Sequence, residues 1–96
     1  MPWTLREGPE YAGSLEAARQ AVVDRQRFTD NLNAARFALQ RDPWGNSYPF
    51  LDEREQLRVF MTKDPSGGYE LVVFFEILRE QLCELKWVEV RRLASD

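Results

Sequence analysis

The chain has 96 residues, 44% hydrophobic and 30% charged, which is the size and composition of one globular domain with a single core. Thirteen basic side chains stand against 16 acidic ones, for a net charge of -3, and this argues against a protein held on nucleic acid by overall charge. Histidine is absent and Cys83 is the single cysteine. The composition therefore excludes His-based triads, His metal sites, Cys-rich zinc sites and an internal disulfide, and we expect no metal ion and no cofactor.

Two further features bear on where the protein works. The most apolar run, Leu71–Phe75, is far shorter than the ~20 residues that a membrane helix needs. The first residues lack the apolar segment of a secretory signal peptide. Together with the single cysteine, these features predict a cytoplasmic protein that does not enter a membrane.

The first half of the chain has the periodicity of helices. Two sets of apolar side chains recur at the 4-3-4 spacing of one helix face. The sets are Tyr11, Leu15, Ala18 and Val22, followed by Phe28, Leu32, Ala35 and Leu39. A polar run at 24–27 separates them, and Thr29 is a good N-cap candidate. We predict a helical hairpin of about 10–26 and 29–41, which Asp42-Pro43 ends.

The second half alternates at period two and is rich in β-branched and aromatic residues, as strands are. Residues 43–54 resemble a loop, and strands are predicted over 57–62, 69–78 and 83–93, with a short strand at 3–6 before the helices. The last three strands form an antiparallel meander, which the first strand joins through the helical crossover. We predict one α+β domain over residues 1–96, of order β-α-α-β-β-β, with the helical hairpin on one face of a four-stranded, mainly antiparallel sheet.

Apolar side chains occur on both faces of the predicted sheet. Leu57, Val59 and Met61 share one face, which we expect to pack on the helices, so that Arg58 points away from them. Two short helices cannot cover both faces, and we predict that a partner protein or a second copy of the chain covers the other one. The alternative is that the N-terminus and the 43–54 loop fold over it. The candidate partner-binding residues on that face are Phe60, Val72 and Phe74.

A family resemblance rests on five segments. They are Trp3-Thr4-Leu5 as a leading strand, the helix pair closing on Leu39–Pro43, and the strand segments Gln56–Phe60, Gly68–Phe74 and Val88–Arg92. In order, length and strand pattern the chain resembles the RelE/ParE toxin superfamily of bacterial toxin–antitoxin systems. The likeness covers nearly the whole chain and lies in architecture rather than in a short motif.

The resemblance implies a small toxin that a cognate antitoxin neutralises. RelE-like members cut messenger RNA in the ribosomal A site, and ParE-like members inhibit DNA gyrase. RelE-type cleavage uses no metal: basic and tyrosine side chains stabilise phosphate charge and move protons during attack by the ribose 2′-hydroxyl. This chain departs from the family by carrying Glu70 after Tyr69, where members often have arginine, and by lacking a later tyrosine.

A metal-independent endoribonuclease without histidine would need guanidinium and ammonium groups around the phosphate, and a proton carrier. The candidate catalytic residues are Arg58, Lys63, Tyr69, Arg91 and Arg92. The alternative is that these are solvated charges paired with neighbouring acids. Residues 42–96 carry seven basic and eleven acidic side chains, -4, the opposite of the charge that favours approach to RNA.

Two functions are therefore expected. The first is a RelE/ParE-like toxin component that acts on translation or on DNA gyrase and has an antitoxin as its partner. The second is a non-catalytic interaction module, or a homodimer joined across the apolar sheet face. The aromatic segment Trp44–Phe50 could stack bases or grip a peptide, or close the edge of the core.

Overall fold

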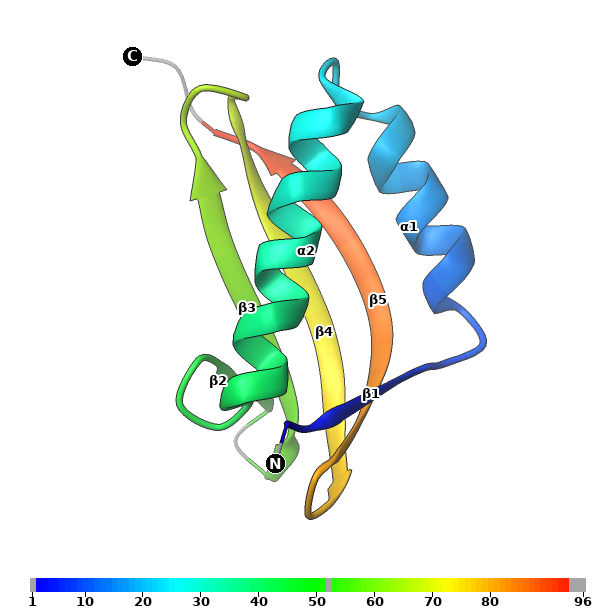
Figure 1. The fold of residues 1–96 in the computed structure, drawn as a ribbon, viewed down its shortest axis with the longest axis vertical. Coiled ribbons are helices and arrows are strands. Elements are labelled where there is room, and N and C mark those ends of the chain that lie inside the picture. The colour runs from blue at the N-terminus through cyan, green and yellow to red at the C-terminus, as the bar shows by residue number, and fades with distance from the viewer. Residues whose placement is uncertain (1, 52, 94–96) are drawn as a thin grey trace.

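The computed structural model describes residues 2–51 and 53–93 and has two layers, a five-stranded sheet and two helices on one of its faces (Figure 1). The elements are β1 (Thr4–Glu7), α1 (Tyr11–Gln20), α2 (Arg25–Arg41), β2 (Tyr48–Leu51), β3 (Arg54–Asp64), β4 (Tyr69–Arg79) and β5 (Leu82–Arg92). The predicted α+β class is confirmed.

The strand order in the sheet is β1-β5-β4-β3-β2, so the first strand lies beside the last. β1 runs parallel to β5, and the other three pairs are antiparallel. The parallel pair arises because the chain passes through both helices between β1 and the meander. The sheet is thus mixed and has five strands, where the sequence predicted four.

The additional strand is β2, which lies inside the segment 43–54 that we predicted as a loop. Tyr48 pairs with Val59 and Pro49 pairs with Arg58. Proline is tolerated here because β2 is the edge strand, and one side of its backbone has no partner strand. The strand has only four residues and follows a strong turn segment, so local patterning did not separate it from the turn.

The helix boundaries differ from the prediction by up to six residues, since α1 ends at Gln20 and not near residue 26. α2 begins at Arg25, and the carboxylate of Asp24 caps it by accepting a hydrogen bond from the Arg27 N–H at 3.0 Å. Thr29, the predicted cap, lies inside the helix, where its hydroxyl donates to the Arg25 carbonyl. The reason is that aspartate is at least as good a cap as threonine, which lets the polar run form the first turn.

The core lies between the two helices and the sheet. Its largest side chains, all at 1% exposure or less, are Tyr11, Phe28, Leu39, Leu71, Phe75 and Leu85. Burying an aliphatic or aromatic side chain of this size stabilises the fold by roughly 1.5–3 kcal/mol. The apolar stripe predicted for α2 is therefore the helix's contribution to the core.

β3 presents its faces the other way round from the prediction. Phe60 pairs with Val73 and packs against the core, so it faces the helices and not the opposite side. Arg58 shares that face and does not point away from the helices. Both alternating sets of β3 contain large apolar residues, so only the register with β4 could decide between them.

Val88 and Val90 also lie on the helix side, since Val88 belongs to the core cluster and Val90 packs against it. The other side of the sheet is called the open face below. Its apolar residues on the three long strands are Leu57, Val59, Met61, Val72, Phe74 and Trp87.

Candidate functional site

The structure does not bring the five predicted catalytic residues together. Arg58 and Tyr69 both lie on the helix side of the sheet, but Arg58 stands opposite Phe75, six residues along β4 from Tyr69. At about 3.3 Å per residue this is a separation of roughly 20 Å. A single phosphate cannot contact both side chains.

Arg58 is a buried structural residue, only 8% exposed. Its guanidinium donates to the Ser47 hydroxyl at 2.6 Å, to the Ser47 carbonyl at 3.0 Å and to the Glu55 carbonyl at 3.1 Å. The Trp44 ring lies over it, with 4.9 Å from Cζ to the ring centroid. Arg58 thereby fixes the segment before β2 against β3, and its donors are engaged within the chain.

Tyr69 takes part in a buried polar cluster at the end of β3 and β4. Its hydroxyl accepts a hydrogen bond from the Asn31 amide at 2.7 Å, and the same amide donates to Asp64 at 2.8 Å. Arg27 also donates to Asp64, and this contact holds the pKa of that carboxyl well below its usual range. Burial raises the pKa of Tyr69. A buried phenol with a raised pKa joins α2 to the strands and is poorly suited to moving protons.

The remaining three candidates are exposed and lie on both faces. Lys63, Glu70 and Arg91 are cross-strand neighbours on the open face, and Arg91 also pairs with Glu89 at 2.9 Å. Arg92 pairs with Tyr69 and so lies on the helix side. The arginine pair therefore divides between the faces, and the acids beside Lys63 and Arg91 offset their charge.

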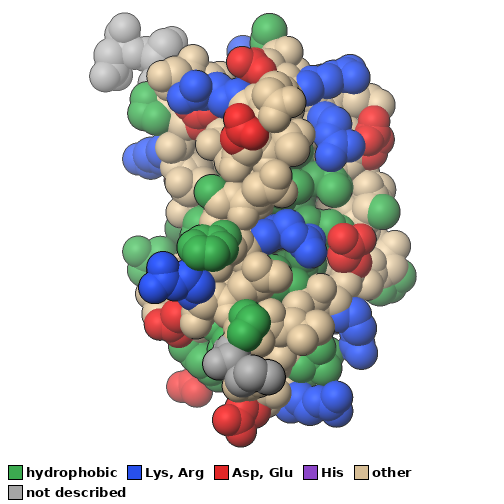
Figure 2. All heavy atoms as spheres, viewed as in Figure 1, with side chains coloured by type: hydrophobic (Ala, Val, Ile, Leu, Met, Phe, Trp, Pro, Cys, Tyr) green, Lys and Arg blue, Asp and Glu red, His purple; other side chains and the backbone are tan. Residues whose placement is uncertain are grey.

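The helix-covered side shows no basic region either. Figure 2 shows blue and red side chains interspersed over it, without a large area of one sign. Proteins that bind nucleic acid through the phosphates concentrate lysine and arginine in a patch or stripe. The visible face lacks that pattern.

The open face carries a row of apolar side chains that crosses four strands. Directly paired residues share a face, and the successive pairs are Tyr48 with Val59, Val59 with Phe74, and Phe74 with Trp87. We call these four residues the aromatic row. Its ends are exposed, Tyr48 by 64% and Trp87 by 42%. Large apolar side chains left accessible in this way typify contact surfaces.

Phe50 and Leu57 extend the aromatic row along the strands. Phe50 is 55% exposed and its ring meets Phe74 edge-on, with 5.2 Å between centroids. Phe50, Phe74, Leu57 and Trp87 line a shallow pocket of about 340 Å³. The pocket has the size and lining to accept one bulky apolar side chain of a partner.

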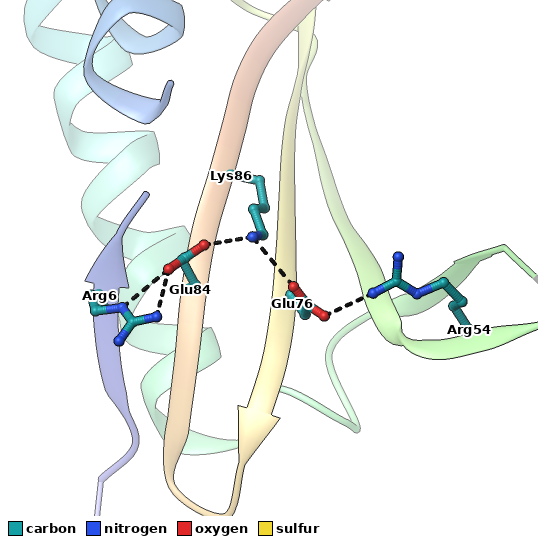
Figure 3. A network of polar contacts seen from close by, with 5 residues as sticks. All are labelled: Arg6, Arg54, Glu76, Glu84 and Lys86. Atoms are coloured by element: carbon teal, nitrogen blue, oxygen red, sulfur yellow. Dashed lines mark hydrogen bonds and ion pairs between the residues drawn. The ribbon is translucent and has the colours of Figure 1, made fainter. Parts of the chain in front are cut away.

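A chain of ion pairs borders the aromatic row on one side (Figure 3). Arg6 contacts Glu84 at 2.7 Å, Lys86 contacts both Glu84 and Glu76, and Arg54 contacts Glu76 at 3.0 Å. This series of ion pairs crosses β1, β5, β4 and β3. Lys86 and then Arg6 lower the pKa of Glu84 through hydrogen bonds. Both glutamates are thus paired with cations, and Glu84, whose pKa is lowered, is not placed as a general acid.

The described residues offer no site for a metal ion and no reactive thiol. Its acidic and cysteine side chains form no cluster of three or more able to hold a metal ion. Among residues 2–51 and 53–93, no helix is both long and apolar enough to cross a membrane. Burial raises the pKa of the Cys83 thiol to about 11, so this thiol is unreactive.

Sequence reasoning placed Val72 and Phe74 on the face without helices, and they lie there, although Val72 is fully buried by its neighbours. Tyr48 and Phe50 were named only as part of the aromatic segment 44–50, and not as part of this face. Both were assigned to a loop, and Trp87 was not singled out from its strand. The available signal was the alternation of β4, since Phe74 marks the face that its cross-strand neighbours share. No family model, curated protein or solved structure matches the chain.

Proposed function

We propose that this protein is a RelE/ParE-like toxin component that acts by holding another protein on its open face, and not by cutting RNA. The toxin assignment draws support from the order of the elements and from the helix pair on one side of the sheet. These are the features that the resemblance implies. The partners are an antitoxin, which neutralises the protein, and a protein target such as DNA gyrase.

One observation carries the choice of binding over cleavage. Three exposed aromatic side chains, Tyr48, Phe50 and Trp87, lie together on the open face, whereas the basic residues of a nuclease site are buried, paired or divided between faces. Aromatic residues dominate the energetics of protein interfaces because each buries a large rigid surface. Cleavage of RNA needs the reverse arrangement, with cations converging on one phosphate.

Induced expression in bacteria tests the proposal. We expect growth arrest that co-expression of a cognate antitoxin relieves, without new cuts in messenger RNA when transcript ends are mapped. Tyr48→Ser combined with Trp87→Ser abolishes the arrest. Phe37→Ser is the matched control, because Phe37 is 60% exposed on α2, away from the sheet. Absence of arrest, or ribosome-dependent cuts in messenger RNA, would overturn the proposal.

A second candidate is the non-catalytic interaction module. The observation in its favour is that opposite charges neighbour each other on the open face, as Lys63 and Glu70 do, which suits self-association. This module would leave growth unaffected while still using the aromatic row. The expression experiment separates the two functions.

A further inference from the structure

We infer that a second copy of the chain covers the open face when the protein is alone. The two copies are related by a two-fold axis that runs parallel to the strands, above the open face and midway between β3 and β4. The inference rests on the proposed function only in treating the open face as a binding surface. It adds the identity of the first occupant and the geometry of its approach.

The aromatic row fits this axis. The rotation exchanges β3 with β4 and β2 with β5, so Tyr48 of one copy faces Trp87 of the second copy, and Val59 faces Phe74. Each contact occurs twice. Sheets that pack face to face lie about 10 Å apart, and the side chains of both fill the space between them.

The charges on the open face fit the same axis. Lys63 on β3 and Glu70 on β4 are cross-strand partners. Exchanging the two strands therefore places Lys63 of one copy opposite Glu70 of the second copy, and the reverse. Opposite charges thus meet on both sides of the axis, which favours this register of the two copies.

Exposed aromatic side chains supply the apolar centre that such a dimer needs. Tyr48, Phe50 and Trp87 keep about half of their surface accessible, and Met61 is 39% exposed. With 150–250 Å² for a whole aromatic side chain, each aromatic offers on the order of 100 Å². The three aromatics thus supply roughly 300 Å² of apolar surface, and the flanking polar residues must supply the rest of the ~800 Å² per partner of a standard interface.

Nucleic acid is a poorer occupant of this surface. The row that crosses β3, β4 and β5 reads Lys63, Glu70, Arg91, and Glu89 lies beside it. A phosphate backbone passing over this row would meet carboxylates as often as cations. The same mixture is favourable when the facing surface is a rotated copy of itself.

Sedimentation velocity over a range of concentrations tests the self-association. We expect a monomer–dimer equilibrium whose Kd rises at least ~10-fold in Trp87→Ser and in Tyr48→Ser, as for anchor residues of an interface. Phe37→Ser, the control on α2, leaves the Kd unchanged. A protein that stays monomeric at every concentration, or a dimer that Phe37→Ser weakens, overturns the inference.

Cross-linking tests the axis. Within one chain Tyr48 and Trp87 lie three strand spacings apart, roughly 14 Å, but the axis places Tyr48 opposite Trp87 of the second copy. At concentrations above the Kd that sedimentation gives for each variant, a mixture of Tyr48→Cys and Trp87→Cys chains is therefore joined by a short bis-maleimide much faster than either variant alone. The native Cys83 is fully buried, so the unmodified protein serves as the blank. Equal cross-linking of each variant with itself overturns the axis.

The two proposals fail in different ways. Growth arrest by a protein that is monomeric at every concentration removes the dimer and leaves the toxin function. A dimer with the expected cross-links and no growth arrest keeps the dimer and removes the toxin function. Because the dimer covers the aromatic row, an antitoxin or target bound there must displace the second copy.

Discussion

The side-chain oxygen of Ser14 in α1 accepts a hydrogen bond from the backbone N–H of Val88 in β5 at 2.9 Å. The hydroxyl also donates to the Tyr11 carbonyl at 2.8 Å. β1 pairs with β5 only along 82–85, so the edge of β5 beyond that point has no neighbouring strand. Ser14 supplies the missing acceptor, and α1 covers an edge that would otherwise be open to further pairing.

Ser14→Ala is expected to lower the free energy of unfolding by about 1–3 kcal/mol, because it leaves a buried N–H without an acceptor. Urea denaturation at neutral pH measures the change. Ser66→Ala in the exposed turn between β3 and β4 is the control, and should stay within about 0.5 kcal/mol of the parent protein. A similarly small effect of Ser14→Ala would contradict this role.

Asp64 predicts a pH dependence of stability. Its pKa lies far below the usual value because Arg27 donates a hydrogen bond to it, with further bonds from the Asn31 amide and the Gly67 N–H. The pKa of an aspartate carboxyl is about 3.9 in an unfolded chain. A carboxyl whose pKa is lower than this in the folded chain stabilises the fold at pH values above the unfolded-state pKa. The stabilisation is lost as the pH falls through the folded-state pKa.

Urea denaturation at a series of pH values tests this linkage. The free energy of unfolding should decrease from about pH 5 downward, and the decrease should be smaller in Asp64→Asn, which cannot ionise. Glu80→Gln in the exposed turn between β4 and β5 should retain the slope of the parent protein. Parallel profiles for the parent and Asp64→Asn would exclude Asp64 as the source of the dependence.

The contacts of Arg58 predict that lysine at this position cannot stabilise the fold as arginine does. Its guanidinium reaches acceptors on Ser47 and Glu55 at once while stacking on Trp44, a geometry that needs a planar fork. Arg58→Lys should therefore lower the free energy of unfolding by about 2–3 kcal/mol, since hydrogen bonds to a charged group are lost in a buried place.

Urea denaturation measures the loss, and limited proteolysis at 43–47 reports whether that segment opens. Arg79→Lys, at the exposed end of β4, is the control. If Arg58→Lys were as stable as the parent protein and yet abolished growth arrest, Arg58 would belong to a functional site instead.

The helices were predictable because their apolar stripes repeat with the helical period. Phe28, Leu32, Ala35 and Leu39 were grouped from spacing alone, and all four are buried. The strong strand at 69–78 was found in the same way, and β4 spans 69–79. One-sided burial imposes a clear period on a sequence, which is why these elements could be read locally.

The orientation of β3 could not be read in this way. Phe60 on one face and Val59 on the other are both apolar, since each face of this sheet carries apolar side chains. Arg58 adds to the ambiguity, because it is buried in contacts from a segment more than ten residues earlier in the chain. The register with β4 resolves the faces, and it is a long-range property.

The aromatic row is equally non-local. Its four residues come from four strands and meet only through three successive pairings. Trp87 stands where the β4–β5 register shifts, so the alternation along β5 is interrupted close to it. Sequence spacing within one strand therefore identified Phe74 but not the side chains that extend it into a surface.

Arg91 and Arg92 provide the last prediction. Arg91 lies on the open face beside Glu70 and pairs with Glu89, whereas Arg92 lies on the helix side opposite Tyr69. Because the two guanidinium groups cannot converge on one phosphate, Arg91→Ala with Arg92→Ala should leave growth arrest unchanged. Exposed ion pairs contribute about 0–1 kcal/mol, so the double variant should also unfold close to the parent protein. Colony counts after induction, with urea denaturation as the check on folding, make the measurement. Loss of arrest in a fully folded double variant would restore the phosphate clamp and with it the nuclease hypothesis.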